Sequence, residues 1–507
     1  MLRGSGMRQR LARRLFPLLA SAGLIAVGMS ATTWATVLIH QKEWALPYDI
    51  WGTMIAATRL VHGQIGGIYA QPTGMVSLPG TAVILTPVAA ITSALGLSLR
   101  LPGPTNLHPE VWLFVGPYQI AISCIELFAA DALAEHLGVP RWKRGLLALA
   151  GVSALWSVSA RWGHPEDAVA TGLLLYAVLA QARGRLGTAG WLAGAAICVQ
   201  PLALLALPMM AALVPWRRAG WYLVRAATPS AVLLAAAGIA NWGVMYTAVT
   251  SQPNSPTINH PTAWTWLAPH MAGGNVAAGP FRLATIVLAC LGAVVVRRRL
   301  YRQLDGDPWP RLVLAEVLWW MALGLALRSF FEPVMVSYYP WPPLAVALIP
   351  AAIGGWSRLT VAGVIAGGLT ALCQGPWHSP WAWWVPIVGG LLAILGVAWP
   401  RWMALPRPAR PGPLGPTAPG GSQAAPSASV SLAAASSSSS SAACLALAKL
   451  KSPSDQTGKT WMCRWGTSRP AMIRPALGAP NASFAASPIF FATTVRCCST
   501  SSGASVH

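Results

Sequence analysis

Apolar segments recur along this chain up to residue 400, and their length constrains the fold more than any other feature. Many are close to the ~20 residues that a helix needs to cross the ~30 Å hydrocarbon core of a bilayer. Because hydrocarbon offers the backbone no hydrogen-bond partner, such segments fold as helices rather than as open sheets. Of the 507 residues, 55% are hydrophobic and 9% are charged, whereas about a quarter of a soluble domain is charged. The sequence therefore predicts an all-α, polytopic transmembrane helix bundle.

The formal net charge of +22 is distributed in a way that argues against a nucleic-acid-binding protein. Lys and Arg occur in short groups beside apolar segments, and no basic face of a soluble domain emerges from them. These groups are Arg8, Arg10, Arg13 and Arg14; Arg141, Lys143 and Arg144; Arg217 and Arg218; and Arg297, Arg298 and Arg299. Basic loops of this kind mark the cytoplasmic side of a membrane protein. We therefore expect a multi-pass protein of the inner (plasma) membrane, with a cytoplasmic N-terminus and tail.

Three regions follow from this pattern. Residues 1–14 form a basic cytoplasmic N-terminus, residues 15–400 form the transmembrane domain with about ten crossing helices, and residues 401–507 form a tail. Outer loops are predicted at 40–110, 163–166, 248–280 and 374–382. The tail is low in complexity, rich in Pro and Ser, and lacks apolar periodicity, so we predict that it is disordered.

Two segments depart from simple crossings. Thr81–Leu99 is apolar, but a full crossing there would move the basic group at 141–144 to the outer side, so we predict a juxtamembrane or re-entrant element. Ala189–Pro215 has basic residues at both ends, which one crossing cannot place on one side. We therefore predict two short helices that turn at Gln200-Pro201.

The chain has thirteen acidic residues, and those predicted on the outer side are the main candidates for chemistry. They are Glu43, Asp49, Glu110, Glu166, Asp167 and Glu332. Asp49 follows the first helix in "YDIW". The turn "RWGHPED" places His164, Glu166 and Asp167 together, beside Arg161. A structural explanation has about equal weight, because Pro followed by two acids favours a helix start and Asp is a common helix cap.

Other charged residues have structural explanations of their own. Arg328 and Glu332 are four residues apart, which suits a weak helical ion pair, although an arginine at an outer helix end also suits a lipid phosphate. Glu316 is predicted to pair with Arg311. Glu126 lies deep in an apolar segment without an obvious partner, which makes it a weak functional candidate.

Two stretches resemble a known superfamily. "YDIWGTMIAATRLVHGQIGGIYA" is similar to the start of the first outer loop in bacterial mannosyltransferases that use polyprenyl-phosphate mannose, which belong to the GT-C membrane glycosyltransferases. "LAGAAICVQPLALLALP" resembles the short-helix hairpin of these enzymes, which often have Lys where this chain has Gln200. The similarity extends, as a pattern of helices and loops, over roughly residues 15–400.

The resemblance implies roles for particular residues. Asp49 would be the general base, and Asp167 or Glu166 would assist it, with His164 nearby. The residues that would hold the donor or acceptor are Arg161, Arg59, Arg328, Glu332 and Gln200. The donor would be a polyprenyl-phosphate sugar and the acceptor a glycan or glycolipid on the outer side. The pattern requires no cofactor, and it leaves open the sugar, the acceptor, the oligomeric state and whether a divalent cation assists.

Two other classes of function remain. A transporter or lipid flippase places polar groups at the bilayer midplane on broken helices. Glu126 and the break at Gln200-Pro201 keep this alternative open. A non-catalytic relative of the same fold is the third.

Overall fold

The computed structural model describes residues 12–38, 49–70, 73, 75, 77–97, 109–250, 253–257, 259–304, 309–374 and 380–400. The predicted tail 401–507 and most of the N-terminal segment 1–14 lie outside the described residues, as do Glu43 and Asp305.

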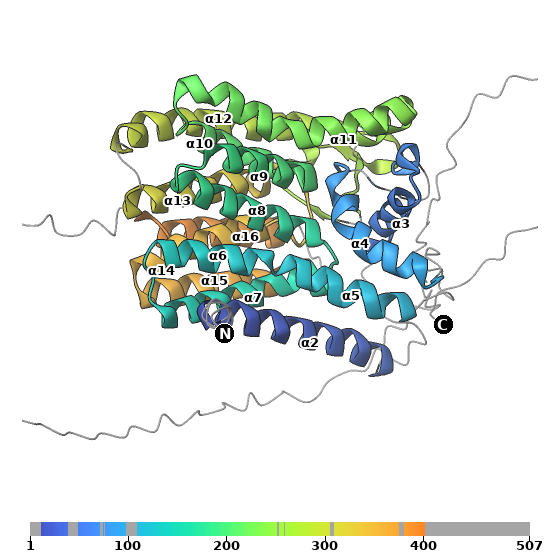
Figure 1. The fold of residues 1–507 in the computed structure, drawn as a ribbon, viewed down its shortest axis with the longest axis horizontal. Coiled ribbons are helices and arrows are strands. Elements are labelled where there is room, and N and C mark those ends of the chain that lie inside the picture. Colours follow the sequence, from blue (N-terminus) through green and yellow to red (C-terminus); the bar gives the residue numbers. More distant parts are fainter. Residues whose placement is uncertain are drawn as a thin grey trace, which may run out of the picture. The chain divides into compact units, whose positions relative to one another are not determined.

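Helices make up most of the described chain and strands very little of it, which confirms the predicted all-α bundle (Figure 1). In chain order the helices that run along the bundle are α2 (Leu15–Leu38), α5 (Pro109–Ser123), α6 (Ile125–His136), α7 (Arg141–Trp156), α8 (Pro165–Ala182), α9 (Leu186–Val199), α10 (Leu207–Ala211), α11 (Trp216–Thr250), α12 (Gly279–Leu300), α13 (Arg311–Phe331), α14 (Trp341–Gly354), α15 (Trp356–Cys373) and α16 (Pro380–Val397). Among the described residues, strands are limited to four two-residue segments: β1 (Pro253–Asn254), β2 (His260–Pro261), β3 (Val276–Ala277) and β4 (Val334–Met335).

Six helices of the described chain are long and apolar enough to cross a membrane. They are those at Leu15–Thr32, Val111–His136, Trp216–Thr250, Gly279–Gln303, Arg311–Phe331 and Trp356–Cys373. Shorter apolar helices, such as α9 and α14, lie beside them in the same bundle (Figure 1). The chain is therefore a membrane-embedded helical protein, while the number of crossings, about ten, stays a prediction.

One end of the bundle gathers the basic segments, and we call it the basic end. Asp131, near the end of α6, lies 2.5 Å from Arg14 and 2.6 Å from Arg144, which join it to the starts of α2 and α7. At the same end Arg299 of α12 lies 2.6 Å from Glu316 of α13. The predicted Glu316–Arg311 pair is therefore wrong, because the end of α12 lies beside α13 and brings a closer arginine.

The opposite end carries the turn His164-Pro165-Glu166-Asp167, which we call the HPED turn, and we call this end the site end. Here the start of α8 meets the end of α9, through a hydrogen bond between Asp167 and Gln200. Trp264, which precedes the 3₁₀ turn η4 (Thr265–Leu267), donates to the Phe330 carbonyl at the end of α13. The chain runs alternately between these two ends, so the basic groups that lie far apart in the sequence come together at the basic end.

The break at Gln200-Pro201 is confirmed. Helix α9 ends at Val199, and the 3₁₀ helix η3 (Pro201–Leu205) follows it directly. The segment then returns along α8, since Gln200 bonds Asp167 at the site end and the Met210 carbonyl accepts from Gln181 near the other end of α8. Proline fixes this reversal because it cannot continue the hydrogen-bonded helix.

A pair of helices, α3 (Asp49–Val61) and α4 (Gly80–Ala94), lies at the site end (Figure 1). Thr81 donates to the Val199 carbonyl, which anchors the start of α4 beside the end of α9. With 15 residues, α4 is shorter than the ~20 residues of a full crossing, which favours the predicted juxtamembrane element.

Small residues allow the central helices to approach closely. A Cβ atom at Gly172 of α8 would lie 2.9 Å from the Glu126 backbone nitrogen of α6. At Gly194 of α9 it would lie 2.7 Å from the carbonyl oxygens of Arg225 and Ala226 in α11. Membrane helices associate through such contacts because lipid supplies no hydrophobic drive between them.

The predicted orientation can be checked with two matched Trp→Cys changes in a background without native cysteines. Trp142 at the basic end is 53% exposed and Trp266 at the site end is 73% exposed. A membrane-impermeant maleimide added to intact cells should label Cys at 266 and should reach Cys at 142 only after permeabilisation. Labelling of position 142 in intact cells would reverse the topology.

Candidate functional site

The turn that precedes α8 is built from irregular helix. Ser157–Arg161 form a π-helical turn, η2, of the kind that is often found at functional sites. Gly163 follows with a φ of 68°, a left-handed conformation that glycine adopts without strain. Pro165 then starts α8, with Glu166 and Asp167 in its first turn, where the helix dipole favours negative charge.

His164 is held between a carboxylate and an aromatic ring. Its Nδ1 lies 2.6 Å from Oε1 of Glu166. Its ring stacks on Tyr338, with 3.9 Å between the ring centroids. Two contacts of this kind orient the imidazole, so the HPED turn meets the segment between α13 and α14.

Asp167 is the most enclosed acid of the turn, with 2% of its surface exposed. Its Oδ1 accepts a hydrogen bond of 2.8 Å from Nε2 of Gln200. Its Oδ2 is buried and has no hydrogen-bond partner among the described residues. A buried carboxylate oxygen without a partner is costly, so this atom is a candidate for contact with a ligand.

Arg328 brings a positive charge to the same region from the end of α13. Its guanidinium lies over the Tyr339 ring, 3.6 Å from the centroid, and its Nε lies 3.6 Å from Glu332. Its charge also interacts with that of Asp167. The site end therefore combines acids, an imidazole and a largely buried arginine. We call this group the HPED cluster; its members are His164, Glu166, Asp167, Gln200, Arg328 and Glu332.

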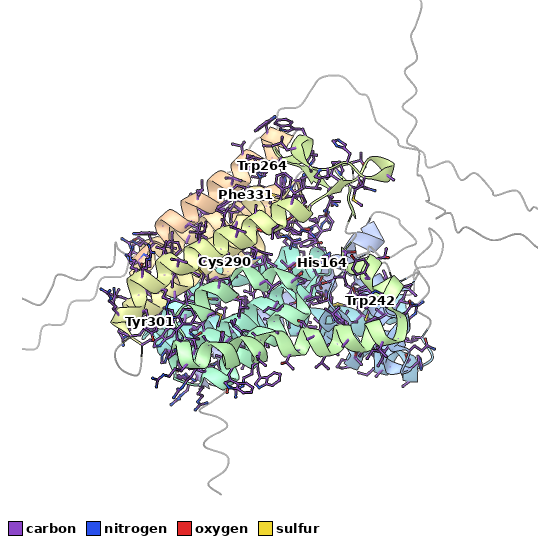
Figure 2. The ribbon with its side chains drawn as sticks, turned by 90° about the horizontal axis from the view of Figure 1, so that it is seen from above. His164, Trp242, Trp264, Cys290, Tyr301 and Phe331 are labelled. Atoms are coloured by element: carbon purple, nitrogen blue, oxygen red, sulfur yellow. The ribbon has the colours of Figure 1, made fainter. Side chains whose placement is uncertain are left out.

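The loop between α11 and α12, within residues 253–277, is folded and packs beside this cluster. Strand β2 pairs with β4, and Thr262 donates to the backbone carbonyl of Glu332 at 2.9 Å. Trp264 lies against Phe331, with 5.7 Å between the ring centroids, and Figure 2 shows the two together. These contacts tie the loop to the segment that carries Arg328 and Glu332.

Protonation of His260 in this loop is expected to weaken the docking of the loop on the bundle. His260 is buried and stacks on Trp383 with ring centroids 3.6 Å apart. Burial lowers the pKa of His260 to about 3, from an ordinary value near 6.5. When the loop detaches from the bundle, His260 returns to its ordinary pKa near 6.5 and binds a proton more readily than in the docked loop. Docking therefore weakens as the pH falls below about 6.5.

We therefore expect protease cleavage within 253–277 to become faster at pH 5 than at pH 7, once corrected for the activity of the protease on a peptide. In His260→Phe, which keeps an aromatic ring on Trp383, the ratio of the two rates should be close to one. Equal ratios in both proteins would show that His260 does not control the docking.

Two of the predicted site residues, Arg59 and Arg161, lie outside the cluster, and the side chain of a third, Asp49, is not described. Asp49 begins α3, but its side chain lies outside the part of the molecule that the structure describes. Arg59 donates to the carbonyls of Gly67 and Ala70 in its own segment. Arg161 is exposed, with its guanidinium 5.7 Å from the centre of the Trp162 ring.

The structure adds residues that sequence reasoning missed. Arg282 at the start of α12 lies 2.6 Å from Glu332, a closer contact than the predicted partner Arg328 makes. Tyr338 and Tyr339 link His164 to Arg328 through ring contacts. The adjacent tyrosines in "SYY" were the available signal, because an aromatic ring can hold a cation such as an arginine guanidinium over its face.

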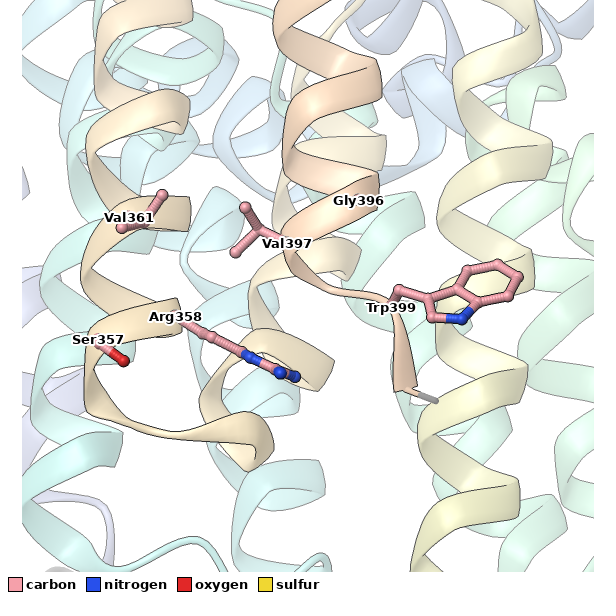
Figure 3. Close-up of a pocket in the computed structure, with 6 residues that line it drawn as sticks. All are labelled: Ser357, Arg358, Val361, Gly396, Val397 and Trp399. Atoms are coloured by element: carbon pink, nitrogen blue, oxygen red, sulfur yellow. The ribbon is translucent and has the colours of Figure 1, made fainter. Parts of the chain in front are cut away.

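Other features of the described residues lie elsewhere. A pocket of about 630 Å³ is lined by Ser357, Arg358, Val361, Gly396, Val397 and Trp399 (Figure 3). It lies between α15 and the end of α16, away from the HPED turn. No group of three His, Cys, Asp or Glu side chains that could hold a metal ion occurs within the described part of the chain.

Comparison with known proteins adds no family assignment. No protein-family model matches this sequence, and no curated protein matches it either.

Proposed function

We propose that this protein is an integral-membrane glycosyltransferase that moves a sugar, most simply mannose, from a polyprenyl-phosphate carrier to a glycan or glycolipid acceptor on the outer side. The observation that carries the proposal is the environment of Asp167. Its Oδ1 is fixed by Gln200, its Oδ2 has no partner among the described residues, and Arg328 lies close enough for the two charges to interact.

The reaction requires a base, a place for the acceptor and a stabilised leaving group. The acceptor hydroxyl attacks the anomeric carbon and gives its proton to a carboxylate, for which the resemblance proposes Asp49. The bond between the anomeric carbon and the phosphate oxygen breaks, and the polyprenyl phosphate leaves with its negative charge. Arg328 suits that charge, since a cation in a site shielded from water stabilises a developing anion strongly.

The roles of the other residues follow from their contacts. Asp167 and the His164–Glu166 pair offer hydrogen-bonding groups that can orient an acceptor hydroxyl. Glu332, which Arg282 holds at 2.6 Å, lies 3.6 Å from Nε of Arg328 and places a negative charge beside its guanidinium. A donor already attached to a membrane lipid accounts for a site at a helix end within a membrane bundle.

Glu126 favours a second candidate, a transporter or flippase. It is 2% exposed, and its Oε2 has no hydrogen-bond partner within the described residues. Buried carboxylates inside a bundle often mark an ion or substrate pathway. A transporter of this kind moves its solute through intact vesicles without covalent change, which distinguishes it from a transferase.

The proposal is tested with purified protein in liposomes and radiolabelled mannosyl polyprenyl phosphate as donor. A membrane fraction enriched in cell-envelope glycolipids provides the acceptors. We expect label to move to the acceptor from this donor and no transfer from a nucleotide-linked mannose. Absence of transfer from every polyprenyl-phosphate sugar tried, together with solute uptake that requires Glu126, would replace the proposal with transport.

Arg328→Ala should raise the KM for the lipid-linked donor roughly ten- to hundredfold, because a charge-assisted hydrogen bond contributes ~1.5–3 kcal/mol. Arg328→Lys keeps the charge without the planar fork and should recover part of the loss. Arg161→Ala, an exposed arginine in the same region, is the matched control and is expected to have a smaller effect. A donor KM unchanged by Arg328→Ala would remove Arg328 from the site.

A further inference from the structure

An apolar groove of about 600 Å³ runs along the outside of the bundle between α2 and α7. Its walls include Phe16, Gly23 and Val27 of α2 and Gly145, Leu149 and Trp156 of α7. Val27 is 58% exposed and Leu149 is 67% exposed, so the groove opens outward, where a membrane protein meets lipid. It belongs neither to the HPED cluster nor to the pocket in Figure 3.

The length of the groove matches one leaflet. Phe16 to Val27 covers about 16 Å at a rise of 1.5 Å per residue, and half of a ~30 Å hydrocarbon core is about 15 Å. The groove has space at its middle, since a Cβ atom added to Gly23 would meet nothing within 4 Å. It also has a floor, because the Phe16 ring would lie 3.2 Å from a Cβ atom added to Gly145.

Positive charge stands at one end of this groove. Arg141 lies one helical turn before Gly145 and donates to the carbonyl of Ala12, one turn before Phe16. Arg13 is exposed there, and Lys143 lies 5.6 Å from the centre of the Trp142 ring. Trp142 is 53% exposed, which suits an aromatic residue at the level of the lipid headgroups.

The described acids of α6 at this end are already engaged by other arginines. Asp131 and Glu135 pair with Arg14 and Arg144. Among the described residues, no salt bridge holds Arg13, Arg141 or Lys143. The three cations therefore present a net positive charge at the mouth of an apolar groove.

We infer that the α2–α7 groove binds one anionic phospholipid, with an acyl chain along Gly23 and the phosphate on Arg13, Arg141 and Lys143. Basic groups at the cytoplasmic ends of transmembrane helices recognise anionic headgroups in this way. Arginine holds phosphate through directed hydrogen bonds, and lysine adds a point charge. The match between the length of the groove and the thickness of one leaflet favours a phospholipid over a polyprenyl chain, which is longer than the groove.

The test uses full-length protein in detergent and native mass spectrometry with two added lipids, phosphatidylglycerol and phosphatidylcholine with identical acyl chains. Wild-type protein should retain one phosphatidylglycerol in preference to phosphatidylcholine. Gly23→Leu fills the groove and should lose this lipid. Gly220→Leu, the same change at an exposed position of α11 where an added Cβ atom also meets nothing within 4 Å, should retain it.

Substitution of Arg13, Arg141 and Lys143 by glutamine tests the headgroup separately. The preference for phosphatidylglycerol should fall roughly fivefold for each cation removed, while binding of phosphatidylcholine stays unchanged. Gly23→Ala leaves most of the groove open and should bind as the wild type does, which separates a filled groove from a misfolded protein.

Three results would overturn the inference. Equal retention of both lipids by the wild type would indicate only annular lipid. Unchanged phosphatidylglycerol binding in Gly23→Leu would place the lipid elsewhere. Displacement of phosphatidylglycerol by one equivalent of polyprenyl phosphate would assign the groove to a different lipid.

Discussion

Asp49→Asn is expected to reduce sugar transfer by a factor of roughly 10²–10⁴, the usual cost of losing a positioned acid–base group. The amide keeps the size of the carboxylate and can accept hydrogen bonds, but it does not take up the proton of the acceptor hydroxyl. The rate constant kcat should therefore fall while the KM for the donor changes little. The measurement is transfer of label from mannosyl polyprenyl phosphate by purified protein in liposomes.

Two further variants make this result specific. Glu135→Gln, the same type of change at a 34% exposed side chain of the basic end, should leave kcat unchanged. Asp167→Asn should also reduce transfer, because Asp167 has the only buried carboxylate oxygen without a hydrogen-bond partner among the described residues of the HPED turn. An Asp49→Asn protein with full activity would show that Asp49 is not the base.

Asp131→Ala is expected to lower the free energy of unfolding by about 3–5 kcal/mol, the cost of removing one partner from a buried ion pair. Asp131 joins three helices, since Arg14 of the α2 start and Arg144 of α7 both contact it within 2.6 Å. Its removal leaves the Arg144 side chain, 6% exposed, without its closest acid. Unfolding by titration with sodium dodecyl sulfate gives the difference.

Glu135 provides the comparison within the same network. It contacts Arg14 at 2.6 Å, but its side chain is 34% exposed, so Glu135→Ala should cost about 0–1 kcal/mol. If Asp131→Ala and Glu135→Ala have equal small effects, the network does not hold the three helices together.

The bundle could be predicted because its signals are local. The length of the apolar segments predicts the helices, and the short basic groups predict which helix ends lie together. The break at Gln200-Pro201 followed from basic residues at both ends of one segment, with proline at its centre. The structure confirms each of these features in the described residues.

The pairing of side chains could not be predicted in the same way. Gln200 and Asp167 are 33 residues apart, and their contact depends on how α8 and α9 are rotated about their axes. Their apolar residues surround the helix, so the sequence does not show which face turns inward. The Arg282–Glu332 pair, 50 residues apart, and the Arg299–Glu316 pair were missed for the same reason.

The cluster itself was predicted in part. The part that was predicted correctly is local in sequence: His164, Glu166 and Asp167 are neighbours, and the turn "GHPED" places them together. Arg59 was proposed for the site because it lies in the similar stretch, but its guanidinium binds the carbonyls of Gly67 and Ala70. An arginine in a short helix that precedes a turn commonly satisfies nearby backbone carbonyls, and sequence similarity does not distinguish the two uses.

We propose that the carboxylates of Asp49 and Asp167 face one cavity at the site end, and the distance between the two carboxylates tests this arrangement. That distance can be measured in an experimental structure of the protein in a lipid nanodisc, determined with a polyprenyl-phosphate donor analogue bound. We predict that the two carboxylates lie within about 15 Å of each other, since one sugar and its phosphate must bridge them. The phosphate should lie beside Arg328. A longer separation, or a phosphate bound away from Arg328, would contradict the shared site.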